Sequence, residues 1–224
     1  MRHLDLTIDF ETCAMTANAA VMQVAIVPWA RYNETDPFLF EDNTTVPYVG
    51  YVDLRTCVVD GFDFDPETVK WWSGRNARAK DAVTKGESEA IGNVLTGMLK
   101  YVRLLRGKYS LTSVCLWCQG MDFDIAVLRN LCRKYGVNLE DDIPHTQFRD
   151  CRTVILEGAL AEARRAEPYV VIQLDRILAG DYDAYNMFAP LPDRYAAGSE
   201  AHDALYDAYR SSWNTWQALR WIRQ

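Results

Sequence analysis

The amino-acid sequence predicts an α/β protein in which helices flank a mixed central sheet. Near the N-terminus apolar and polar residues alternate as in strands, and further along the chain apolar residues recur at helical spacing. One apolar run lies between two helical patterns and adds a later strand. The chain has 224 residues, of which 49% are hydrophobic and 25% charged. We therefore expect one globular domain spanning residues 1–224.

Three strands are expected first. Residues 4–10 alternate with a period of two, residues 20–29 form a largely apolar run, and residues 46–54 form the third strand. A polar loop or hairpin connection is expected over residues 32–45. Because short connections join these strands, the sheet is expected to begin antiparallel.

Helical patterns then take over. Asp65-Pro66-Glu67 is typical of a helix start, with a capping aspartate, a proline at the first position and an acid in the first turn. Apolar residues from Ile91 to Leu105 recur at helical spacing, and Gly107 is the expected C-cap. Residues 113–120 are expected to form a strand that ends in a glycine.

The C-terminal part is expected to be mostly helical. Residues 124–135 form a helix closed by Gly136, and residues 151–165 form another. Residues 180–200 are rich in Asp, Pro, Tyr and Gly and are expected to form a long loop. A final helix is expected over residues 203–221.

The sequence shows no signal peptide and no run of the roughly 18 apolar residues that would span a bilayer. A soluble, cytoplasmic protein with reduced cysteines is therefore expected. Cys115 and Cys118 form a C-x-x-C, but a strand would direct them to opposite faces. We therefore favour buried structural thiols over a zinc or redox pair at these two positions.

The formal net charge of −7 argues against a nucleic-acid partner, because phosphates favour basic surfaces. However, residues 70–108 contain nine Lys/Arg and only three Asp/Glu. This segment is either a solvated helical face or a strip that follows a phosphate backbone. Two bound divalent cations would also offset four of the negative charges.

Three short segments carry candidate catalytic residues. Asp9 and Glu11 point to the same face of a strand, where two carboxylates raise each other's pKa unless a cation lies between them. Asp124 follows a strand and a glycine turn, and either it or Asp122 would cap the next helix or bind a metal. His202 and Asp207 lie about one turn apart at the start of the last helix.

In this order, D-x-E, F-D and H-x-x-x-x-D resemble the DEDDh exonuclease superfamily, which has a ribonuclease H-like fold. The segments 61–72, 117–124, 149–153 and 202–207 look like exonuclease A of T-even bacteriophages and its phage and bacterial relatives. This resemblance implies a 3′→5′ exonuclease acting on DNA, releasing nucleoside 5′-monophosphates in a bacterial host cytoplasm if phage-encoded. It also selects Asp124 over Asp122 as the ligand.

The resemblance further implies two Mg²⁺ or Mn²⁺ ions. Asp9 would bridge the ions, Glu11 and Asp207 would complete one site, and Asp124 would hold the other ion. His202 would be the general base. The partner would be a nucleic acid with a free 3′ end, and the protein a monomer or homodimer without membrane contact.

Five further residues are candidate substrate contacts. The resemblance places Phe10, Thr12 and Met22 beside the terminal nucleotide. Trp72 either stacks on a base or packs in the core, whereas core packing is favoured for Trp71. Arg152 either contacts a phosphate or forms a salt bridge at a helix start.

Three rival functions remain. The first is an exoribonuclease acting on short RNA or RNA 3′ tails. The second is a catalytically idle binding module, which would have no need of all five acid and histidine residues. The third is a polymerase proofreading subunit.

Overall fold

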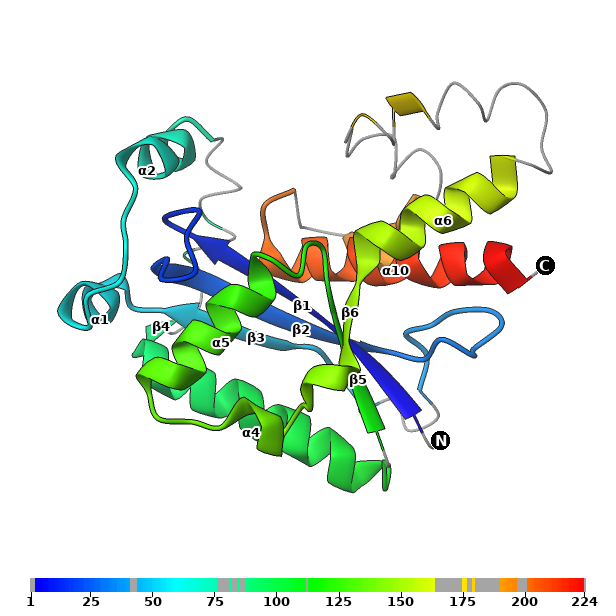
Figure 1. Cartoon of the computed structure of the whole chain (residues 1–224), viewed down its shortest axis with the longest axis horizontal. Helices are drawn as coiled ribbons and strands as arrows, with labels where there is room; N and C mark the ends of the chain where they lie inside the picture. The colour runs from blue at the N-terminus through cyan, green and yellow to red at the C-terminus, as the bar shows by residue number, and fades with distance from the viewer. Residues whose placement is uncertain are drawn as a thin grey trace.

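The protein is built on one mixed sheet of six strands in the order β4-β3-β2-β1-β5-β6, flanked by helices (Figure 1). This architecture confirms the fold class that the sequence predicts. The structure is a computed structural model. It describes residues 3–40, 44–75, 81, 84, 88–111, 113–163, 175–176, 179, 190–196 and 201–223.

The sheet begins antiparallel and continues parallel. β1 pairs with β2, and β2 with β3, in antiparallel register, as expected from the short connections. β5 pairs in parallel with both β1 and β6, and β4 in parallel with β3. The strands are β1 (His3–Thr12), β2 (Val21–Trp29), β3 (Tyr48–Val52), β4 (Ser88–Glu89), β5 (Ser113–Cys118) and β6 (Phe148–Asp150).

Helices cover both faces of the sheet. The last helix lies along one face over β1 and β2 and packs against α6, whereas α4 and α5 lie on the other face (Figure 1). The α-helices are α1 (Leu54–Val59), α2 (Pro66–Ser73), α4 (Ile91–Lys108), α5 (Asp124–Lys134), α6 (Cys151–Ala163), α9 (Asp193–Ala196) and α10 (Ala204–Arg223). Short 3₁₀ helices span Leu139–Asp141 and His145–Gln147.

The two faces of β1 differ in chemistry because side chains alternate along a strand. Leu4, Leu6, Ile8 and Phe10 are buried in the larger hydrophobic core with α4 and α5. The intervening positions carry Asp5, Thr7, Asp9 and Glu11 on the face that α10 covers. This alternation brings two acidic residues of β1 under the start of α10.

Several element boundaries follow the sequence pattern. Asp65 caps α2 and accepts a hydrogen bond from the Thr68 backbone N–H at 2.9 Å, as predicted. Gly136 has a φ of 66° just after α5, which a glycine adopts without strain. Cys118 lies in the core with α4 and α5, whereas Cys115 packs with α6 and α10, so the C-x-x-C pair is split between two faces as expected. All six cysteines are buried and form no disulfide bond.

Other boundaries were predicted wrongly. The third strand ends at Val52, because Asp53 caps α1 by accepting from the Arg55 backbone N–H. Gly107 lies inside α4, which continues to Lys108. Most of the loop expected over residues 180–200 lies outside the described residues, and its described part contains α9. None of the helices in the described part of the chain is long and apolar enough to cross a membrane.

Candidate active site

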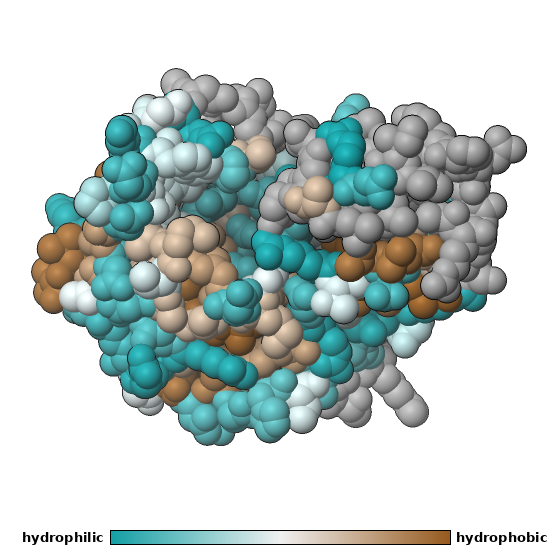
Figure 2. All heavy atoms as spheres, turned by 45° about the horizontal axis from the view of Figure 1, so that its top comes forward, coloured by the Kyte–Doolittle hydropathy of each residue, from teal (hydrophilic) through white to brown (hydrophobic). Residues whose placement is uncertain are grey.

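Four carboxylates meet in one cavity at the end of β1. Asp9 and Glu11 come from β1, Asp124 opens α5, and Asp207 lies in the first turn of α10. The cavity has a volume of about 390 Å³. Its lining consists of Asp9, Phe10, Glu11, Gln119, Phe123, Asp124, Ala201, His202, Asp207, Arg210 and Ser211. The protein face that carries these strand ends is hollowed near its middle, where hydrophilic side chains gather (Figure 2).

The positive groups around this cavity do not balance the negative charge of its carboxylates. Glu11, Asp124 and Asp207 are only 7%, 5% and 8% exposed. Burial raises the pKa of Asp9 and Glu11 well above the usual range, and repulsion from the neighbouring acids adds to this effect. Burial also raises the pKa of Asp207, and it raises the pKa of Asp124 to about 7.

One guanidinium opposes this repulsion. Arg210 lies one turn beyond Asp207 on α10 and forms an ion pair with it at 3.1 Å. Its charge lowers the pKa of Asp9, Glu11 and Asp207. Among the described residues that line the cavity, four are acids and Arg210 is the only permanent cation. Buried oxygen donors in such excess suit divalent cations such as Mg²⁺ or Mn²⁺.

His202 lies at the edge of the cavity, just before α10. Ligand atoms of His202, Glu11 and Asp207 all lie within 4.8 Å of one another. The His202 backbone N–H donates to Asp207 Oδ2 at 2.8 Å. Burial lowers the pKa of the imidazole, and Arg75 and Arg210 lower it further, although Asp207 raises it. A neutral imidazole next to two carboxylates can accept a proton from water at neutral pH.

The structure separates the two aspartates that compete for the ligand role. Asp124 is buried and lines the cavity, whereas Asp122 is exposed and lines none of the described cavities. A backbone hydrogen bond from Phe10 holds the Asp124 carboxylate. Asp124 therefore lies with the other three acids, and it does not cap α5, which lacks a side-chain cap.

A second cavity of about 460 Å³ adjoins the first. It shares Phe10, Glu11, Phe123 and His202 with the first cavity, and its other lining residues are Thr12, Met15, Glu67, Thr68, Trp71 and Trp72. Three of the five candidate substrate residues (Phe10, Thr12 and Trp72) line it. Trp72 Nε1 donates to the Thr12 backbone oxygen at 3.1 Å, which fixes the ring beside β1.

The remaining predictions for this region have mixed outcomes. Trp71 is 39% exposed, and the Arg75 guanidinium lies 3.6 Å from its ring centre, so the prediction of core packing is wrong. Met22 packs half-buried against the core and lines neither cavity. Arg152 is exposed near Gly120, and its charge lowers the pKa of Asp124, although it lines neither cavity.

The described basic residues of the segment 70–108 lie on or beside two helices, α2 and α4, which lie apart in Figure 1. Lys70 and Arg75 lie beside Trp71, close to the second cavity. Arg103 instead donates to Asp142 at 2.6 and 2.7 Å, and Arg106 donates to the Asp142 backbone oxygen. Residues 76–80, 82–83 and 85–87 lie outside the described residues.

Sequence reasoning missed two polar groups of the first cavity besides Arg210. Gln119 directly follows β5, and its Oε1 accepts a hydrogen bond from Ser211 Oγ at 2.6 Å. Ser211 and Arg210 lie four and three residues after Asp207 on α10, which is the spacing that places side chains on one helix face. This spacing from Asp207 is the sequence signal that could have identified Arg210 and Ser211 as residues of the cavity.

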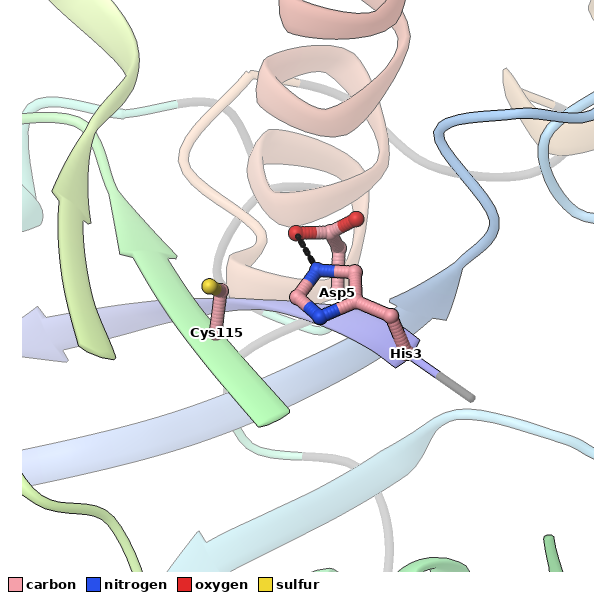
Figure 3. Close-up of side chains that lie close together, drawn as sticks. All are labelled: His3, Asp5 and Cys115. Carbon is pink, nitrogen blue, oxygen red and sulfur yellow. Dashed lines mark hydrogen bonds and ion pairs between the residues drawn. The ribbon is translucent and has the colours of Figure 1, made fainter. Parts of the chain in front are cut away.

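A second polar cluster lies at the opposite end of β1, where His3, Asp5 and Cys115 approach one another (Figure 3). Asp5 is completely buried and accepts hydrogen bonds from Arg31, from Trp117 Nε1 at 2.6 Å and from His3 Nε2 at 3.3 Å. The Asp5 carboxylate therefore already has two cationic partners, Arg31 and His3, and one indole N–H donor, that of Trp117. We interpret the cluster as a structural ion-pair network, because a metal ion there would face the Arg31 guanidinium.

Replacing Asp5 with asparagine is expected to destabilise the fold by about 3–5 kcal/mol, because it leaves the Arg31 and His3 cations without a counter-charge. Hydrogen bonds with Asp5 and Cys115 raise the pKa of His3 to about 9. The His3 contribution to stability is therefore complete below its unfolded pKa of about 6.5 and is lost as the pH rises through about 9.

Urea unfolding of both proteins between pH 6 and 10 measures this difference. The gap in unfolding free energy between wild type and Asp5→Asn should narrow towards the alkaline end. Glu140→Gln is a matched control, because Glu140 pairs with an exposed histidine at the surface. Equal stability of wild type and Asp5→Asn at pH 6 would contradict the structural role of the cluster.

Comparison with known proteins adds one match. Residues 4–175 match the model of a family described as "3′-5′ exoribonuclease Rv2179c-like domain". Asp9, Glu11 and Asp124 fall inside this range, whereas His202 and Asp207 lie beyond it and are placed by the geometry alone. No curated protein matches the chain. The match supports an exonuclease of the ribonuclease H-like superfamily, and it gives no support to a specific relationship with phage exonuclease A.

Proposed function

Since the chain belongs to the Rv2179c-like 3′–5′ exoribonuclease family, we propose that it removes nucleotides from the 3′ end of RNA by metal-dependent phosphodiester hydrolysis. The observation that carries the proposal is the meeting of Asp9, Glu11, Asp124 and Asp207 with His202 around one cavity. A module that only binds nucleic acid has no need of four acids, three of them buried, beside a histidine.

The four carboxylates would hold the metal ions. Acids with raised pKa values hold their protons, and a divalent cation that binds to the carboxylates would displace these protons. The charge of the cation would then offset the repulsion between the carboxylates. When bound, two such ions supply an activated water and neutralise charge on the leaving 3′ oxygen. Arg210 adds one positive charge against four acids, which leaves the cavity suited to further positive charge.

His202 would accept the proton of the attacking water. Its imidazole lies next to Glu11 and Asp207, at the junction between the two cavities. Burial lowers the pKa of the imidazole and so favours the neutral form, which a general base requires. The second cavity would hold the terminal nucleotide, with the Trp72 ring available to stack on the base.

The family is described as an exoribonuclease family, so RNA is proposed as the substrate in preference to DNA. The resemblance to phage exonuclease A implied the opposite preference. RNA differs from DNA by the 2′-hydroxyl, which both donates and accepts hydrogen bonds. Glu67 and Thr68 line the second cavity and carry side-chain oxygens that can accept a hydrogen bond from a 2′-hydroxyl. They are candidates for discrimination between the two sugars.

Cleavage of matched RNA and DNA strands tests the proposal. Single strands of identical sequence, labelled at the 5′ end, are incubated with Mg²⁺, Mn²⁺ or EDTA. We expect a ladder that shortens from the 3′ end with either metal and faster on RNA, and no products in EDTA. Faster cleavage of DNA would restore the DNA exonuclease as the better assignment. If RNA and DNA both stayed intact with either metal, a module that binds nucleic acid without cleaving it would be the better assignment.

A further inference from the structure

A buried glutamine ties the sheet to the start of the helix that carries His202 and Asp207. Gln23 lies in β2 opposite Glu11 of β1, and its side chain is completely buried. Its Nε2 donates to Asp203 Oδ1 at 3.2 Å, and its Oε1 accepts from the Ala204 backbone N–H at 3.0 Å. Both ends of the amide are thus used on the first turn of α10.

The neighbouring groups determine which end of the Gln23 amide donates and which end accepts. Asp203 is 3% exposed and directly precedes α10. Its Oδ1 accepts from the Leu205 backbone N–H at 2.9 Å as well as from Gln23. The acceptor oxygen at position 203 therefore requires a donor at position 23, while the Ala204 N–H requires an acceptor from the same side chain. An amide meets both requirements at once.

These hydrogen bonds hold the backbone that directly follows His202. It precedes Asp203 directly and has a φ of 71°, in the left-handed region that costs a non-glycine residue energy. Such a conformation persists only where the surroundings fix it. On one side the His202 backbone N–H donates to Asp207, and on the other the ring meets Trp71 at 4.7 Å between centres. Gln23 fixes the backbone that follows.

We propose that Gln23 is a positioning residue for catalysis: its two hydrogen bonds to Asp203 and Ala204 fix the first turn of α10 on β2 and so direct His202 into the cavity. The inference rests on the proposed function, in which His202 is the general base. Gln23 itself lines neither of the two cavities, so it acts through His202 and not by touching the substrate.

Variants at positions 23 and 203 test this role through the polarity of the two side chains. Gln23→Glu keeps the acceptor for Ala204 but places a carboxylate against the Asp203 carboxylate. Asp203→Ala removes the acceptor for Gln23 and Leu205, whereas Asp203→Asn retains an oxygen that can accept from both.

We expect Gln23→Glu and Asp203→Ala each to lower kcat by up to about 100-fold with little change in KM, since a displacement of about 1 Å in a catalytic group has that effect. Asp203→Asn should lose far less than Asp203→Ala, because its amide oxygen can still accept from Gln23 and from the Leu205 N–H. Gln23→Met, which keeps the volume but has neither donor nor acceptor, should behave like Gln23→Glu and replaces it if Gln23→Glu does not fold. Thermal unfolding of each variant establishes that it is folded at the assay temperature.

A His202→Ala background separates this inference from the proposed function. If Gln23 acts through His202, adding Gln23→Glu to His202→Ala should cause no further loss of kcat. An equal loss in both backgrounds, or a folded Gln23→Glu or Gln23→Met with wild-type kcat, would overturn the inference. If His202→Ala itself had the wild-type rate, the role of His202 as general base in the proposed function would fail instead.

Discussion

Alanine at position 9 is expected to abolish measurable RNA cleavage. Asp9 lies between the other acids: the charges of Asp124, Asp207 and Glu11 all act on its carboxylate. A ligand in this central place would be shared by both proposed ions, so its loss removes the charge stabilisation that the ions supply. Each 1.4 kcal/mol of lost transition-state stabilisation slows the reaction about tenfold. The measurement is kcat/KM for labelled RNA at saturating Mn²⁺.

The control for this variant is Asp122→Ala. Asp122 is also an aspartate at the sheet end, but it is exposed and lines neither cavity. We expect it to retain most of the wild-type rate. Activity of Asp9→Ala within tenfold of wild type would show that Asp9 is not a metal ligand.

Alanine at position 202 is expected to lower kcat by about 10²–10⁴-fold, the usual contribution of a general base. The residual activity should still require a divalent cation, because the four carboxylates remain. The base must be neutral to act, so the wild-type rate should rise with pH through the pKa of His202. Because burial lowers that pKa, the midpoint of this rise should lie at a pH below the ordinary histidine value.

The pH profile gives the discriminating result for His202. In the His202→Ala variant the rise on the acidic side that belongs to the imidazole should disappear. A variant that loses activity but keeps the wild-type profile would assign His202 a structural role. A rate equal to that of the wild type would remove it from the mechanism.

Long periodic segments of the fold were predictable, and short ones were not. β1 and α4 carry enough residues for their apolar periods to be read, and Asp65-Pro66 marks the start of α2 by local chemistry. β4 has two residues and β6 three, which is too short for any period. These strands exist because a neighbouring strand offers hydrogen bonds, which is a tertiary effect.

The same division holds for the site. The meeting of the four acids and His202 in one cavity was predictable, because they stand in three short motifs along the chain. The exposure of Trp71 was not, since two adjacent tryptophans are usually read as core, yet none of the residues of α2 is buried. Gln23 was also missed, because its partner Asp203 is 180 residues away in the sequence.

Thermal unfolding with and without Mn²⁺ tests the metal site most directly, and it does not depend on the choice of substrate. In EDTA the clustered acids destabilise the wild type at neutral pH, since their folded pKa values are raised above the unfolded ones. Millimolar Mn²⁺ should therefore raise the melting temperature of the wild type. In Asp9→Ala the melting temperature in EDTA should lie above that of the wild type, and Mn²⁺ should no longer raise it. An unchanged wild-type melting temperature in Mn²⁺, or a full increase retained in Asp9→Ala, would contradict the assignment of these carboxylates as metal ligands.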